Sequence, residues 1–128
     1  VGEARRILNS FLQFIEQDTS ESIIIAATNN QKLLDQALFR RFDDVLHYAM
    51  PSESEIIRLF DYKLKSYDRY FFVSSDLVSK AKSLSHAEII RACDDAIKHS
   101  ILNGTSIDNE QLMKLLDERI DAYSAKEA

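Results

Sequence analysis

Residues 23–55, "IIIAATNNQKLLDQALFRRFDDVLHYAMPSESE", decide the fold of this sequence. The stretch opens on a continuous apolar run at residues 23–28, led by three isoleucines. Continuous hydrophobicity without alternation is typical of a strand covered on both faces, as in a parallel sheet flanked by helices. A loop and a short helix with Asp35 as its N-cap come next, and residues 44–51 predict a second strand that Pro51 ends. Strand, short helical crossover and strand together predict a parallel α/β unit.

Helical patterns lie on both sides of this unit. Residues 3–17 place apolar side chains at helical spacing and predict an amphipathic helix. After Pro51 the pattern stays helical, and capping signals mark where three helices start: Ser52 with Glu55, Ser85 with Glu88, and Asp108. A further helix is expected within residues 74–84. The sequence thus predicts a mostly helical α/β fragment, with helix, strand, short helix and strand over residues 1–50 and an all-α four-helix part over residues 51–128.

Composition narrows the class of protein. The chain has 128 residues and a net charge of −5, and this acidic balance does not favour sequence-independent nucleic-acid binding. Its apolar runs are far shorter than the ~20 residues that span a bilayer, so we expect a cytoplasmic protein without a membrane segment. The single cysteine, Cys93, can form no internal disulfide and lies among apolar residues, which predicts a small buried hydrophobic side chain.

Polar residues follow the first predicted strand. Thr28, Asn29 and Asn30 stand at its carboxyl end, the edge at which open α/β sheets bind ligands. An asparagine amide can donate to a phosphate oxygen and accept from a water, which suits it to hold an attacking water. The alternative is a strand-to-loop turn that uses asparagine for its conformational tolerance.

Arg40 and Arg41 are adjacent in an otherwise apolar run. Neighbouring side chains on a helix diverge by about 100°, so one arginine can pair locally, with Asp43 or Asp44, while the other projects outward. An outward guanidinium stays charged at physiological pH and matches phosphate oxygens bidentately. The alternative is a solvated surface pair.

The combination of these features resembles the second half of the ATPase module of AAA+ proteins, in the AAA clade. In that family an apolar strand ends in A-T-N. It is followed by a D-x-A-L helix, one or more arginines, F-D, a second strand and a proline. "SLSHAEIIRACDDAIKHSIL" resembles the lid helix of the family, and "VGEARRILNSFLQFIE" is similar to the helix after the Walker B strand. The resemblance implies that residues 1–50 are the C-terminal part of a P-loop parallel-sheet subdomain and residues 51–128 its helical lid.

The resemblance also implies roles for single residues. Asn29 matches sensor 1, which orients the hydrolytic water, and Arg40 and Arg41 match the arginine-finger positions that reach into a neighbouring subunit. Many members separate their arginines by Pro-Gly, whereas here they are adjacent; Arg41, directly before Phe-Asp, is our first choice for the finger.

The lid turn near the adenine and ribose is matched by Ser85, His86 and Ala87, and Leu59 falls where the first lid helix touches the base. Ser83 stands where the lid motif usually has glycine. No arginine occupies a typical sensor 2 position, as is usual for the clade.

The implied activity is ATP hydrolysis with Mg²⁺, coupled to remodelling of a protein substrate. The resemblance also implies a homo-oligomeric ring, which we expect to be a hexamer. The 128 residues contain no G-x-x-x-x-G-K-[ST] and no strand that ends in the acidic pair of Walker B. The family would place both before Val1, so we expect this chain alone neither to bind ATP tightly nor to hydrolyse it.

Other functions stay open. One is a nucleotide-independent adaptor or inactive ring subunit with the same fold, and another is a DNA-handling ATPase, which would need a basic surface. No metal site is expected, because Asp95 and His99, one helical turn apart, lack a third ligand.

Overall fold

The computed structural model describes residues 2–30 and 39–127. Its contacts divide the chain into two compact units, Val1–His47 and Tyr48–Ala128. The division falls close to the boundary predicted at Met50 and Pro51. That the units are a large α/β subdomain and a lid stays a prediction.

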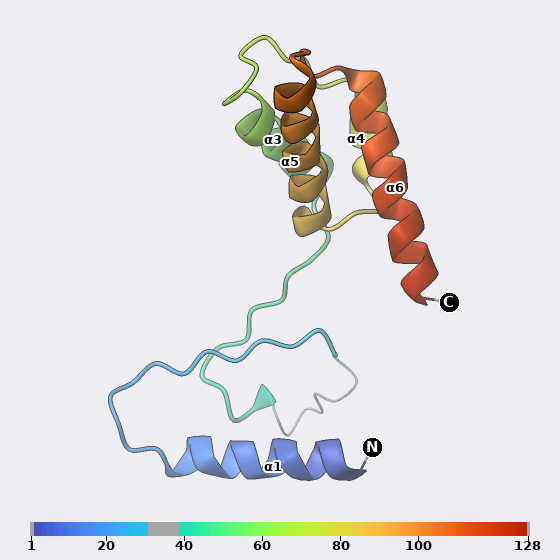
Figure 1. Cartoon of the computed structure of the whole chain (residues 1–128). Helices are drawn as coiled ribbons and strands as arrows, with labels where there is room; N and C mark the ends of the chain where they lie inside the picture. The colour runs from blue at the N-terminus through green and yellow to red at the C-terminus, as the bar shows by residue number, and fades with distance from the viewer. Residues whose placement is uncertain (1, 31–38, 128) are drawn as a thin grey trace. The chain divides into compact units, whose positions relative to one another are not determined.

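The first unit begins with helix α1, Gly2–Gln17. Figure 1 shows it as the blue helix that carries the N-terminus. The helix buries Leu12 and leaves Ile7, Phe11 and Phe14 exposed. The amphipathic helix predicted over residues 3–17 is therefore present, although most of its apolar side chains face solvent.

The predicted strands do not form a sheet. Residues 23–28 and 44–50 have no assigned secondary structure, and the described part of the chain contains no strand. Ile23 and Ile25 are 89% and 88% exposed. A strand depends on hydrogen bonds to neighbouring strands, and two short strands do not make a stable sheet in water. The short helix expected between them, with Asp35 as its cap, falls mainly on residues 31–38, outside the described residues.

The second unit consists of the helices α3 (Glu53–Leu64), α4 (Ser75–Ala81), α5 (His86–Asn103) and α6 (Asn109–Glu127). The predicted capping box of α3 is confirmed. The Ser52 backbone N donates to Glu55 Oε2 at 2.8 Å, and the Glu55 backbone N donates to Ser52 Oγ at 3.4 Å. This reciprocal pair satisfies amides that would otherwise lack partners at the start of a helix.

The other helix ends also follow the sequence signals. Ser85 Oγ accepts from the Glu88 backbone N at 3.3 Å, and Asp108 Oδ1 accepts from the Gln111 backbone N at 2.7 Å. Helix α5 ends at Gly104, whose φ of 63° lies in the left-handed region that favours glycine.

One apolar core joins the four helices of the second unit, with α5 packed against α3 and α6 and α4 packed against the same two helices. Cys93 is fully buried in this core, as predicted. The core residues of the second unit are Ile56, Phe60, Leu64, Phe71, Leu77, Val78, Ala81, Leu84, Ile89, Ala92, Cys93, Ala96, Ile107, Leu112 and Leu116. Across residues 2–30 and 39–127, the helices are too short or too polar to cross a bilayer.

Candidate functional site

Asn29 stands in a short hydrogen-bonded turn of the first unit. The Asn30 backbone N donates to Thr28 Oγ1 at 3.0 Å, and this bond closes the turn around Asn29. All three residues are exposed. The local geometry is a turn, but residues 23–28 before it form no strand and neither asparagine has a positive φ, so a strand-to-loop turn that depends on the tolerance of asparagine is not confirmed. The Asn29 carboxamide is accessible from solvent.

Arg41 forms an ion pair with α1. Its Nε lies 3.1 Å from Glu16 Oε1, and the two side chains are 38% and 49% exposed. The prediction that one arginine pairs with Asp43 or Asp44 is wrong about the partner, because Asp44 Oδ1 instead accepts from the Val45 backbone N at 2.9 Å. The Asp44 carboxylate thus accepts a hydrogen bond from the backbone of its own loop, whereas Arg41 pairs with Glu16, which is distant in sequence.

Arg40 differs from its neighbour. It is exposed, and within residues 2–30 and 39–127 no ion-pair partner lies within reach of it. The two guanidinium groups therefore have different surroundings, as the divergence of adjacent side chains predicts. Both are accessible, and guanidinium geometry suits phosphate oxygens.

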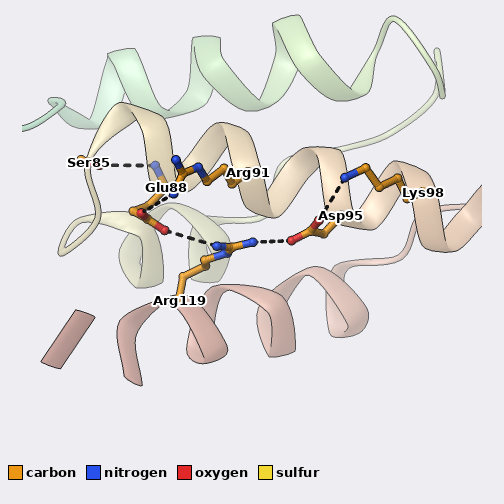
Figure 2. Close-up of polar contacts among 6 residues, drawn as sticks. All are labelled: Ser85, Glu88, Arg91, Asp95, Lys98 and Arg119. Carbon is orange, nitrogen blue, oxygen red and sulfur yellow. Dashed lines mark hydrogen bonds and ion pairs between the residues drawn. The ribbon is translucent and has the colours of Figure 1, made fainter. Parts of the chain in front are cut away.

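The proposed lid residues belong to the second unit. Ser85 caps α5, His86 is half-buried, Ala87 is exposed, and Leu59 of α3 packs against the core. Figure 2 shows that α3 and α5 start at the same end of the second unit. Hydrogen bonds from Ser52 lower the pKa of Glu55, and the charge of His86 makes a smaller contribution in the same direction. The start of α3 and the predicted adenine-facing turn are therefore neighbours.

A polar cluster that the sequence interpretation missed connects α5 to α6. Arg119 Nη2 lies 2.5 Å from Asp95 Oδ2, and Arg119 Nη1 lies 3.8 Å from Glu88 Oε2 (Figure 2). Glu88 and Asp95 are seven residues apart, which puts them on one face of α5. The seven-residue spacing could have indicated that the two carboxylates share a face of α5. It could not have identified Arg119 of α6 as the residue that pairs with them.

Metal-binding groups are not assembled in the described part of the chain. No three His, Cys, Asp or Glu side chains gather there in a way that could hold a metal ion. Asp95 is engaged by Arg119, and His99 Nδ1 lies 3.2 Å from Asn103 Nδ2. Asn29, Arg40 and Arg41 carry exposed amide and guanidinium groups, which are hydrogen-bond donors.

Comparison with known proteins identifies the family. The family model described as "ATPase family associated with various cellular activities (AAA)" matches residues 1–50. An uncharacterized AAA family ATPase of Sinorhizobium fredii is 38% identical over 100 residues, which are 78% of this chain and 30% of that relative. The chain belongs to the AAA family of ATPases.

Two further relatives of this AAA chain have named functions. An ATP-dependent zinc metalloprotease FtsH of Parabacteroides distasonis is 30% identical over 90% of this chain and 18% of the relative. A proteasome-activating nucleotidase of Sulfurisphaera tokodaii is 33% identical over 80% of this chain and 27% of the relative. The AAA chain thus spans less than a third of the length of these curated relatives. No solved structure matches it.

Proposed function

We propose that this chain is the C-terminal part of an AAA ATPase module that couples ATP hydrolysis to remodelling of a protein substrate. In this proposal residues 1–50 end the large α/β subdomain and residues 51–128 are its lid. Relatives named as an ATP-dependent protease and a proteasome-activating nucleotidase support a protein substrate. The observation that carries the proposal is the accessible Arg40–Arg41 pair, which follows the exposed Asn29 turn in a chain of this family.

The arginines would act on the nucleotide of a neighbouring subunit. Phosphoryl transfer spreads negative charge over the phosphoryl oxygens, and an arginine supplied in trans accelerates hydrolysis by roughly 10³ to 10⁵. Such a residue has to lie on an outer surface, as both arginines do. Hydrolysis would then depend on assembly into a ring, which we propose is a hexamer.

The Glu16 ion pair does not prevent this role. Both side chains are more than a third exposed, and ion pairs of that kind contribute only about 0–1 kcal/mol. A neighbour's phosphate carries more negative charge than Glu16 and can replace it as the partner of Arg41. Glu16 would hold Arg41 in place until that phosphate arrives.

Asn29 and the start of α5 would have separate roles toward the nucleotide. The Asn29 carboxamide can accept from the attacking water while it donates to a phosphate oxygen. Bound Mg²⁺ would neutralise charge on the β- and γ-phosphates. Ser85, His86, Ala87 and Leu59 would contact adenine and ribose, and the small exposed Ala87 leaves room for a flat ring.

Arginine substitutions in the full-length protein test the proposal. We expect Arg41→Ala to reduce kcat for ATP by roughly 10³ or more while the Kd for ATP stays nearly unchanged. Arg40→Ala, measured in parallel, shows which arginine contributes more. Arg69→Ala is the matched control, because Arg69 is also exposed but lies in the second unit.

The outcomes separate the alternatives. Equal loss of ATP binding and hydrolysis in Arg41→Ala would contradict a finger role. Wild-type full-length protein that binds no nucleotide would instead indicate an adaptor or an inactive ring subunit.

A further inference from the structure

Arg119 of α6 connects two turns of α5. Its guanidinium lies between Glu88 in the first turn and Asp95 farther along the same face, with the shorter contact to Asp95 at 2.5 Å (Figure 2). Arg91 and Lys98 flank the two carboxylates, at 3.4 Å from Glu88 and 3.7 Å from Asp95. One cation of α6 thus holds two anions of α5.

The bridge between Arg119, Glu88 and Asp95 is partly buried. The side chains of Arg119, Glu88 and Asp95 are 30%, 19% and 34% exposed. Partial burial reduces screening by water and salt, so such contacts hold geometry better than exposed pairs do. Lys114 and Glu110 offer the contrast, because they form an ion pair on the same helix at 73% and 85% exposure.

Glu88 makes two contacts, one through its backbone and one through its side chain. Its backbone N–H donates to Ser85 Oγ and so closes the cap at the start of α5, while its carboxylate contacts Arg119. The contact with Arg119 and the Ser85 cap therefore meet at one residue. The position of α6 is coupled in this way to the turn formed by Ser85, His86 and Ala87.

We propose that Arg119 is a positioning residue for this turn and, through it, for nucleotide binding. The inference rests on the proposed function, in which the turn contacts adenine and ribose. Arg119 itself touches no substrate in this account. Contacts to the base are equal in the ground state and the transition state, so their loss raises KM and leaves kcat unchanged.

Steady-state kinetics of the full-length protein test the inference. We expect Arg119→Gln to raise KM for ATP about fivefold or more and to leave kcat nearly unchanged. Fivefold is about the lower end of the change in affinity that coupling between two distinct sites typically causes. Arg119→Lys should give an intermediate KM, because an ammonium group keeps the charge but lacks the planar fork that spans two carboxylates. Lys114→Gln is the matched control and should not change KM. A fall in kcat at constant KM, or an equal effect of Lys114→Gln, would overturn the inference.

Amide hydrogen exchange in the 128-residue chain separates this inference from the proposed function. Arg119→Gln should accelerate exchange at the Glu88 amide, which the Ser85 cap protects, and leave the core amides of Cys93 and Ala96 unchanged. Unchanged exchange at Glu88 would overturn positioning by Arg119. Faster exchange at Glu88 with an unchanged KM would contradict the nucleotide role of the turn instead.

Discussion

Arg41 and Glu16 form the contact that most affects how the first unit is interpreted. Their 3.1 Å ion pair gives the arginine a partner within its own unit. The sequence predicted that the adjacent arginines would diverge, because that follows from local backbone geometry. It did not predict Glu16, since a pair between distant residues depends on how α1 packs. Arg119 was missed for the same reason.

Cys93 allows a prediction at the scale of a single residue. Burial, with a smaller contribution from the charge of Asp94, raises the pKa of its thiol from 9.0 to about 12. The reactive species is the thiolate, which is then almost absent at pH 8. We expect the folded chain to react very slowly with a thiol-specific disulfide reagent at pH 8, and the chain unfolded in guanidinium to react at the rate of a free cysteine. Labelling of the folded chain at that same rate would contradict a buried, neutral thiol.

The helices of the second unit show which elements could be predicted from the sequence. Their starts were set by contacts within four residues, such as the Ser52 and Asp108 caps, and the structure has these contacts. The strands at residues 23–28 and 44–50 were predicted from continuous hydrophobicity, which signals burial between other elements. Such burial depends on neighbouring strands, which the described residues do not supply.

The capping box of α3 makes a prediction at the scale of an element. Ser52→Ala should lower the free energy of unfolding by about 0.5–2 kcal/mol, because it removes the side-chain acceptor for the Glu55 amide. Urea unfolding followed by circular dichroism measures this, with exposed Ser79→Ala on α4 as the control. An equal effect of both substitutions would contradict a capping role.

The same box predicts a pH dependence. Hydrogen bonds from Ser52 lower the pKa of Glu55 below its ordinary 4.5. A carboxylate whose pKa falls on folding stabilises the folded chain above pH 4.5, and this contribution is lost as the pH falls through the folded value. As the pH falls below 4.5, the free energy of unfolding of Glu55→Gln should therefore decrease less than that of the unchanged chain.

At the scale of the whole molecule, the two units of the chain differ in how many of their apolar side chains they bury. The second unit buries a continuous core, whereas the first buries Leu12 and exposes Phe14 and the isoleucines at 23 and 25. The proposed finger and sensor thus belong to the less protected unit and the proposed lid to the better packed one. The 128 residues contain no phosphate-binding loop of the G-x-x-x-x-G-K-[ST] type.

Action in trans is the central claim, and a mixed-ring ATPase assay tests it most directly. Full-length subunits with both Arg40→Ala and Arg41→Ala would be mixed with subunits that lack the phosphate-loop lysine but keep both arginines. Each parent alone should be inactive. The mixture should regain hydrolysis, because a site between an intact phosphate loop and a neighbour's intact arginines is complete. A mixture as inactive as its parents, despite proven co-assembly, would contradict the account.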